Sequence, residues 1–279
     1  MAVSEQLKAL VGQMPDPDDR GMYTENIDKE KIEKAIATIH AGGRDNVQGL
    51  IEMLGEPGSD QDVKPHYALH NLANHTVIAK DENGRRALCE MLAEALSGNY
   101  SPYIKGFLCQ TLQWFGRRES VTALGKLLTD EDLCDPAAMA LVAIKDGAAE
   151  PLRAALPRAA GRCRLTILHS LAALADAGAA GAFKQALQDE DREVRLAAGA
   201  GLARLGDAGA IELLLTAAEA DPGWERTQAA KHCLVLAEKL AAAGKQTDAR
   251  RIYQHLRDTR RDPSEAYLRE AAEKALAAA

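Results

Sequence analysis

The sequence has few aromatic residues, no paired cysteine motif and no excess of positive charge. Aromatic residues make up 4% of the 279 residues although 47% are hydrophobic, and most of that apolar content is Ala and Leu rather than Val or Ile. Ala and Leu are strong helix formers, whereas sheets favour β-branched and aromatic residues. The composition therefore predicts an almost wholly helical protein without large sheets.

The cysteine and charge content argues against several classes of protein. The five cysteines are Cys89, Cys109, Cys134, Cys163 and Cys233. Their odd number, their wide spacing and the absence of a CxxC pair argue against a disulfide framework and against a zinc cluster. The 34 Lys and Arg against 41 Asp and Glu give a net charge of -7, which disfavours a general nucleic-acid binder.

The sequence predicts neither a leader nor a membrane span. Residues 1–10 lack a basic region followed by an apolar stretch, and no later stretch is apolar for long enough to cross a bilayer. We expect a soluble protein with no membrane or nucleic-acid partner. Unpaired thiols favour the cytoplasm, although a signal peptide that had been removed would leave no trace.

The chain contains an internal repeat, seen most clearly in the segment DEDREVRLAAGAGLARLGDAGAIELL at residues 189–214. Gly206 is suited to end one helix, and the carboxylate of Asp207 is suited to cap a second. A helix with one apolar face cannot bury it alone, so the segment predicts a helical hairpin that stacks on its neighbours. The apolar residues at helical spacing on the first helix are Val194, Ala198, Leu202 and Leu205.

The same unit recurs at a regular spacing towards the N-terminus. Asp207 is preceded by Asp176 and Asp146, each followed by small residues and an amphipathic segment, and a third step reaches Arg117. Four units are predicted, with two apolar columns that form a continuous spine. The columns are Leu205, Leu174, Ile144 and Phe115 in one case and Leu202, Leu171, Leu141 and Leu112 in the other.

Looser hairpins flank these units. They are expected at residues 27–54, 63–96 and 224–256, with a closing helix at residues 267–277. The predicted fold class is thus all-α: an α-solenoid of about seven antiparallel helix hairpins with a C-terminal capping helix. Residues 1–26 are expected to be an N-terminal extension and linker, an arm in which Pro15 and Pro17 interrupt a helix begun at Ser4. Residues 27–279 are expected to form a single domain.

The unit at residues 189–214 resembles the HEAT-like repeat of the bilin-lyase type, and the resemblance extends over about residues 101–220. It implies a right-handed superhelix with outer first helices and inner second helices, and usually a binding role. The segment at residues 241–253 is similar to the second half of a tetratricopeptide unit and suggests a different end cap. The whole chain resembles bacterial HEAT modules that occur beside sugar-acting domains, including 3-keto-glycoside hydrolases.

The densest group of chemically active side chains lies in the segment KPHYALHNLANH at residues 64–75. His66 and His70 are four residues apart, so on a helix both imidazoles reach one face, with Asn74 one turn further. Together with His75 they are candidate metal ligands. The alternative, which a bare H-x-x-x-H pair favours, is that the histidines fill a repeat interface by packing and hydrogen bonds. We therefore expect no metal and no cofactor.

No catalytic constellation is recognisable. The HEAT-like iron enzyme deoxyhypusine hydroxylase carries His-Glu dipeptides, and none of the seven histidines here precedes Glu. HEAT-like DNA glycosylases rely on a basic groove with an aromatic pocket, whereas this chain is acidic and poor in aromatics. Close helix packing explains Gly199 and Gly201 better than a nucleotide-binding loop does. Cys163 occupies the core column of Val194, which indicates a structural thiol. We expect no enzymatic activity.

Two charged columns run through the repeats. One contains Arg195, Arg164 and Lys105, and the other contains Asp207, Asp176 and Asp146. One interpretation is a charged strip for a ligand. The favoured interpretation is structural: the aspartates cap second helices, while the arginine stems cover the stack and their heads bond turn carbonyls or acids.

Charge is polarised along the chain. Residues 223–262 contain nine Lys and Arg against five Asp and Glu, whereas residues 1–62 contain six against thirteen. The basic segment is suited to bind an acidic peptide, a phosphate or the acidic end of another copy, and the alternative is a solvated terminal face. The candidate partner-binding residues are Arg250, Arg251, Gln254, Arg257, Arg260 and Arg261.

Two classes of function remain. The leading hypothesis is a non-catalytic protein-protein interaction scaffold that uses the concave face of the solenoid. The alternative is an accessory domain of a carbohydrate-processing enzyme of the 3-keto-glycoside hydrolase kind, or a weak metal site at the histidines. Further candidate surface contacts are Arg85, Arg86, Arg118, Lys126, Lys184 and Glu212.

Overall fold

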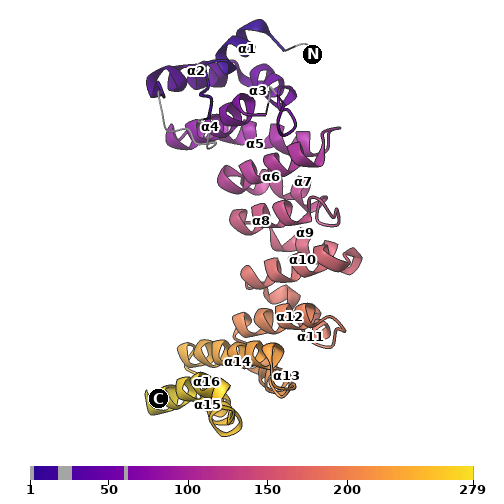
Figure 1. Cartoon of the computed structure of the whole chain (residues 1–279), viewed down its shortest axis with the longest axis vertical. Helices are drawn as coiled ribbons and strands as arrows, with labels where there is room; N and C mark the ends of the chain where they lie inside the picture. Colours follow the sequence, from indigo (N-terminus) through magenta and orange to yellow (C-terminus); the bar gives the residue numbers. More distant parts are fainter. Residues whose placement is uncertain (1–2, 18–26, 60–61, 279) are drawn as a thin grey trace. The chain divides into compact units, whose positions relative to one another are not determined.

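The computed structural model describes residues 3–17, 27–59 and 62–278. Over these residues the chain forms sixteen α-helices, five short 3-10 helices and no β-strand (Figure 1). It divides into two compact units, Met1–Pro151 and Leu152–Ala279. The predicted all-α solenoid class is confirmed, since each unit is built from stacked helix pairs. No helix in this described part of the chain is both long and apolar enough to span a membrane.

The first unit consists of a short helix followed by helix pairs. Its helices are α1 (Glu5–Val11), α2 (Lys29–Ala41), α3 (Gly43–Glu52), α4 (Lys64–Ile78), α5 (Glu82–Leu96), α6 (Pro102–Phe115), η1 (Arg118–Ser120), α7 (Val121–Gly125) and α8 (Cys134–Ile144). First helices stack on first helices, as α2, α4, α6 and α8 do in turn, and α3 packs on α5. The α2–α3 and α4–α5 pairs lie within the hairpins predicted at residues 27–54 and 63–96.

The N-terminal helix belongs to this stack. Ser4 caps α1 by accepting a hydrogen bond from the Leu7 amide at 3.2 Å, and the helix ends at Val11, before Pro15 and Pro17. Leu7, Val11 and Met14 are buried, and α1 contacts α2, α3 and α4. Residues 5–14 of the predicted N-terminal extension therefore pack on the helices that follow them. Most of the predicted linker, residues 18–26, lies outside the described residues, and the division at residue 26 stays a prediction.

The second unit continues the alternation of long and short helices. α9 (Ala149–Ala155) spans the residues where one unit ends and the other begins. There follow η2 (Leu156–Arg158), α10 (Gly161–Ala173), η3 (Ala177–Ala179), α11 (Ala180–Ala186), α12 (Arg192–Leu205), η4 (Ala208–Ala210), α13 (Ile211–Ala217), α14 (Trp224–Ala242), α15 (Gln246–Thr259), η5 (Pro263–Glu265) and α16 (Ala266–Ala278). α10, α12 and α14 stack in turn, and α15 packs between α14 and α16.

Local sequence explains where the helices of the clearest repeat begin and end. Asp191 caps α12 by accepting from the Glu193 amide at 2.8 Å, and Gly206 ends it in the left-handed conformation at φ 69°. Asp207 then accepts from the Gly209 amide at 3.1 Å and caps the second helix of the same pair, η4 followed by α13. The predicted roles of Gly206 and Asp207 are confirmed.

One of the two predicted apolar columns is fully buried. Leu112, Leu141, Leu171 and Leu202 are each 0% exposed. In the other column only Phe115 is buried, whereas Leu205, Leu174 and Ile144 are half-buried and cover the core rather than fill it. Gly201 permits close helix packing as predicted, because a Cβ there would lie 2.5 Å from Cζ of the buried Phe183.

Candidate partner-binding surface

The second helix of the α14–α15 pair, α15, has one buried and one exposed side. Its buried residues recur at helical spacing, and they are Ala249, Ile252, Tyr253 and Leu256. Five of the six predicted contact residues are exposed on α15 or directly after it: Arg250, Arg251, Gln254, Arg257 and Arg261. This amphipathic pattern explains why α15 packs on α14 and α16 while it presents cationic groups to solvent.

The exposed arginines make few ion pairs, and those ion pairs are themselves exposed. Arg251 pairs with Glu212 of α13 at 2.5 Å, and both side chains are more than half exposed. Arg257 pairs with the adjacent Asp258 at 2.8 Å. Within the described part of the chain Arg250 makes no ion pair. Exposed pairs contribute little free energy, so these guanidinium groups can exchange their present partners for others.

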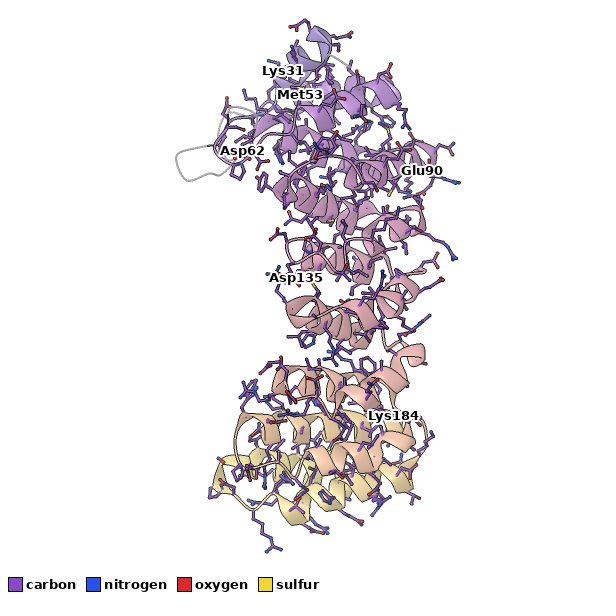
Figure 2. The ribbon with its side chains drawn as sticks, turned by 90° about the vertical axis from the view of Figure 1, so that its right-hand side faces the viewer. Lys31, Met53, Asp62, Glu90, Asp135 and Lys184 are labelled. Carbon is purple, nitrogen blue, oxygen red and sulfur yellow. The ribbon has the colours of Figure 1, made fainter. Side chains whose placement is uncertain are left out.

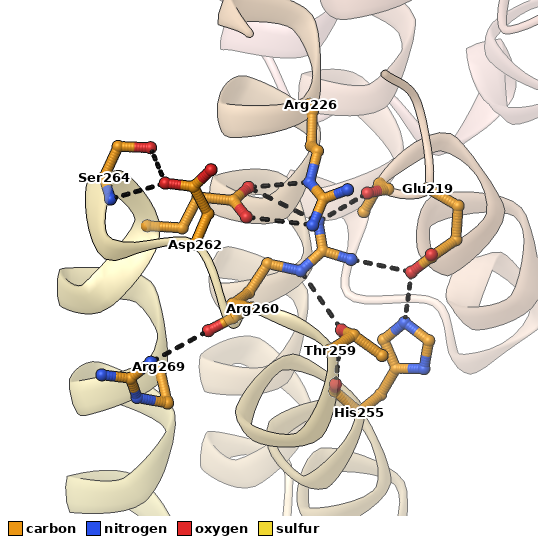
Figure 3. Close-up of polar contacts among 10 residues, drawn as sticks. Glu219, Arg226, His255, Thr259, Arg260, Asp262, Ser264 and Arg269 are labelled. Carbon is orange, nitrogen blue, oxygen red and sulfur yellow. Dashed lines mark hydrogen bonds and ion pairs between the residues drawn. The ribbon is translucent and has the colours of Figure 1, made fainter. Parts of the chain in front are cut away.

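The sixth predicted contact residue, Arg260, is buried, with 0% of its surface exposed. Its Nη1 donates to the Ala218 carbonyl at 2.7 Å, and its Nη2 donates to a Glu219 carboxylate oxygen at 2.7 Å (Figure 3). The assignment of Arg260 to the contact surface is therefore wrong. The reason is local: α15 ends at Thr259, and Arg260 has a non-helical ψ of 75°, so its side chain no longer follows the spacing of the helix.

Arg226 lies in the same buried cluster. It binds Glu265 through two parallel hydrogen bonds, Nε to Oε1 at 2.8 Å and Nη2 to Oε2 at 2.9 Å (Figure 3). The Glu265 side chain is 7% exposed and also lies 3.7 Å from Nη1 of Arg260. The cluster thus ties α14, the end of α13 and the segment before α16 together.

Arg226 belongs to a series of arginines that recur at a constant spacing, one in each repeat. Arg164, Arg195 and Arg226 each lie near the start of a first helix, and each pairs with an acid further along the chain. Arg195 also donates to the carbonyls of residues 189 and 190 at 2.7 and 2.9 Å, as the structural interpretation predicts. Sequence reasoning found Arg164 and Arg195 but missed Arg226, although its spacing is the same. The pairs are Arg164 with Asp189, Arg195 with Glu225 and Arg226 with Glu265.

The predicted aspartate column has mixed roles. Asp207 caps a second helix, but the carboxylate of Asp176 makes no cap and instead accepts from Arg153 at 2.6 Å. Asp146 pairs with Arg118 at 3.3 Å. Lys105, the third predicted cation of the other column, makes no ion pair with any residue that the structure describes.

Most of the other candidate surface contacts are exposed, and one is not. Arg86, Arg118, Lys126, Lys184 and Glu212 are exposed, and Lys184 projects from the short helix α11 (Figure 2). Arg85 is 7% exposed. Its Nε lies 2.9 Å from Oε2 of Glu82, and its Nη1 lies 2.8 Å from Oε1 of Glu119. Its assignment as a surface contact is wrong, because it is an internal tie between α5 and the turn before α7.

The three candidate metal ligands lie in different surroundings. His66 is buried against Phe107, with ring centroids 4.4 Å apart, whereas His75 packs on His40 with centroids 5.3 Å apart. His70 is exposed. Among the described residues no group of three or more His, Cys, Asp or Glu side chains is arranged to hold a metal ion. The ring contacts of His66 and His75 are of the kind that the packing interpretation predicts.

All five cysteines are buried, and none of them forms a disulfide. Burial raises the pKa of the Cys109 thiol and of the Cys233 thiol to about 12. A thiol with a raised pKa is a poor nucleophile at neutral pH, because the thiolate is the reactive form. This burial agrees with the interpretation of Cys163 and the other cysteines as small core residues.

Two cavities in the second unit occupy equivalent positions in successive repeats, and the sequence did not reveal either. The first has a volume of about 430 Å³ and the second about 420 Å³. Leu156, Arg164 and Gln185 line the first cavity, and their counterparts in the next repeat, Leu187, Arg195 and Thr216, line the second. The second cavity is also lined by Leu196, Leu213, Leu214, Glu212, Glu219, Glu225 and His232.

His232 projects against a glycine in the wall of the second cavity. A Cβ on Gly199 would lie 2.8 Å from Nδ1 of His232, so only glycine admits this contact. Desolvation by burial, with smaller contributions from Arg204 and Lys231, lowers the pKa of His232 to about 4. The imidazole is therefore neutral at neutral pH.

The stacked pairs of a longer first and a shorter second helix define a helical-repeat protein. A family model described as HEAT repeats matches residues 149–235. Residues 149–235 of the chain are therefore HEAT repeats. The finer resemblance to the bilin-lyase type of repeat stays a prediction.

Comparison with solved structures gives repeat proteins of low sequence identity. An engineered protein is 19% identical, with a TM-score of 0.50, and the match covers 97% of this chain and 77% of that chain. Human deoxyhypusine hydroxylase in complex with glycerol is 18% identical, with a TM-score of 0.33 and coverage of 98% and 95%. A designed armadillo repeat protein in complex with a (KR)4 peptide is 20% identical, with a TM-score of 0.30 and coverage of 98% and 100%. A comparison with curated proteins gives no match.

Proposed function

We propose that this HEAT-repeat protein is a non-catalytic scaffold that binds another protein, with the exposed side of α15 as a contact surface. The observation that carries the proposal is a set of exposed residues on α15, whose other side is buried, and just after it: Arg250, Arg251, Gln254 and Arg257 on the helix and Arg261 after it. A guanidinium group presents several donors in a fixed plane and binds carboxylates through paired hydrogen bonds. The partner is therefore an acidic protein segment.

The arrangement of the second helices supports this proposal. Lys184 of α11 and Glu212 of α13 are exposed on second helices, as the arginines of α15 are. The ion pair of Arg251 with Glu212 links α15 to α13 across the surface. Successive second helices in a repeat stack form one extended surface, which suits a partner that contacts several repeats.

The test compares the unmodified full chain with the variant Arg250→Glu, Arg251→Glu, Arg257→Glu. Captured proteins are identified by mass spectrometry, and the binding of each purified partner is then measured directly. The matched control is Arg158→Glu, Arg192→Glu, Arg204→Glu, which makes the same change of charge at three other exposed arginines of the same unit.

We expect the α15 variant to weaken binding at least tenfold at low salt, because three attractive contacts become repulsive, while the control changes it by less than about threefold. Equal loss in both variants would mean that only net charge matters and would contradict the α15 assignment. A partner that binds both variants as tightly as the unmodified protein would also contradict it.

A further inference from the structure

In the repeat after the second cavity, a side chain of the protein itself fills the position that is equivalent to the cavity. Leu187 and Gln188 of the second cavity correspond, in the next repeat, to Ala218 and Glu219. At that later position the guanidinium of Arg260 occupies the interior and donates to the Ala218 carbonyl and to Glu219, both at 2.7 Å. The space between the end of a second helix and the neighbouring arginine–glutamate ion pair can therefore hold an arginine side chain.

The second cavity repeats the main parts of this arrangement without such an arginine. The pair of Arg195 with Glu225, at 2.6 and 2.8 Å, corresponds to the pair of Arg226 with Glu265. The space itself measures about 420 Å³ and is lined by residues of α12, α13 and α14 and of the segments that follow α11 and α13. It therefore has room for a side chain that arrives from outside the chain.

The lining of the second cavity matches the two halves of an arginine. An apolar wall suits its aliphatic stem, and three glutamates face its cationic head. Glu212 pairs with Arg251 through Oε1 alone. Glu219 binds His255 and Arg260, also through Oε1 alone. Within the described residues Oε2 of both glutamates accepts no hydrogen bond. His232 adds no positive charge, because it is neutral at neutral pH. The leucines of the apolar wall are Leu187, Leu196, Leu213 and Leu214.

We infer that the second cavity is a binding site for an arginine side chain carried by a basic segment of a protein partner. Glu212 and Glu219 accept from the guanidinium through their remaining oxygens, and the leucines cover its stem. The site differs from the α15 surface in position and in the charge of its ligand, so it does not depend on the proposed function.

The first cavity provides an internal comparison. It has nearly the same volume, but its lining contains Arg164, Pro157 and Gln185 and no carboxylate. Each cavity contains one repeat arginine, Arg164 or Arg195, which is already paired with an acid. The first cavity therefore offers an incoming guanidinium no carboxylate, while the second offers Glu212 and Glu219. An arginine side chain is therefore expected to bind the second cavity more tightly than the first, although the two cavities have the same place in their repeats.

The experiment measures the fluorescence anisotropy of a labelled (Gly-Arg)4 peptide mixed with the full chain. The control peptide has citrulline in place of each arginine, which keeps the shape and removes the charge. Thr216→Arg places a competing guanidinium in the second cavity, and Gln185→Arg makes the same change of charge at the equivalent exposed position of the first cavity. Circular dichroism verifies that both variants are folded.

We expect the arginine peptide to bind at least about tenfold more tightly than the citrulline peptide. Thr216→Arg should weaken its binding about tenfold, Gln185→Arg less than about twofold, and Glu212→Gln about threefold to fivefold. Equal binding of the two peptides overturns the inference, and so does equal weakening by Thr216→Arg and Gln185→Arg. The α15 experiment uses an acidic ligand, and its variants change no residue that lines the second cavity, so either result can fail without the other.

Discussion

Replacing Arg260 with methionine tests the buried cluster at the end of α15. Methionine keeps an unbranched apolar stem and removes the guanidinium that donates to Ala218 and Glu219. The side chain of Glu219 is 50% exposed and keeps His255 at 2.9 Å, so water can replace the lost donor there. The Ala218 carbonyl loses its buried donor, and this loss dominates the cost.

The expected loss for Arg260→Met is about 1–3 kcal/mol of unfolding free energy, the cost of leaving one buried acceptor unsatisfied. Glu265 keeps both hydrogen bonds from Arg226 and is not left as an isolated charge. Arg226→Met is different, because it leaves the 7% exposed Glu265 with only Arg260, at 3.7 Å. Breaking a buried pair in this way costs about 3–5 kcal/mol, so Arg226→Met is expected to be the more damaging change.

Urea unfolding of the full chain, followed by circular dichroism, measures the change in stability. Hydrogen exchange reports whether the loss is local: amides of α16 should exchange faster in both variants, while amides of α6 in the first unit should not change. A cost for Arg260→Met equal to or larger than that for Arg226→Met would refute the reasoning. A cost below about 0.5 kcal/mol for both would refute it as well, since that is the range of exposed ion pairs.

Two further predictions concern the second unit. Gly201→Ala should lower stability in thermal unfolding, because overpacking against Phe183 costs about 1–3 kcal/mol; Gly181→Ala, with nothing within 4 Å, should raise it by about 0.5–1 kcal/mol. The folded pKa of His232 is about 4, below the ordinary 6.5, so the unfolded chain takes up this proton first and stability falls as pH drops from 6.5 through 4. His232→Gln should remove this part of the acid sensitivity of the urea midpoint, and an unchanged pH profile would contradict the assignment.

Features set by neighbouring residues were predictable from the sequence. The carboxylate of Asp207 and the freedom of Gly206 act within one turn, and both roles were predicted correctly. The same holds for the α14–α15 pair at residues 224–259, because its apolar spacing is a property of each helix alone. The contacts of the Arg195 head with turn carbonyls followed from the regular repetition of that position.

Features set by packing between repeats were not predictable. Arg85 and Arg260 read as surface charges in the sequence, yet each enters an interior where carboxylates from other repeats meet it. Asp176 has the spacing of a cap but is held by Arg153 instead. The two cavities depend on how far the side chains of three or four helices extend, which no spacing along the chain encodes.

The arginine pairs have a consequence for the order in which the protein is made. In each pair the arginine comes first in the chain and its acid follows at or beyond the start of the next repeat, as in Arg164 with Asp189 and Arg226 with Glu265. On the ribosome a repeat therefore exposes an uncompensated cation until the segment that follows it has been synthesised. Each of these arginines is thus neutralised by the segment that follows its own repeat, and Glu265 neutralises Arg226, the last arginine of this series.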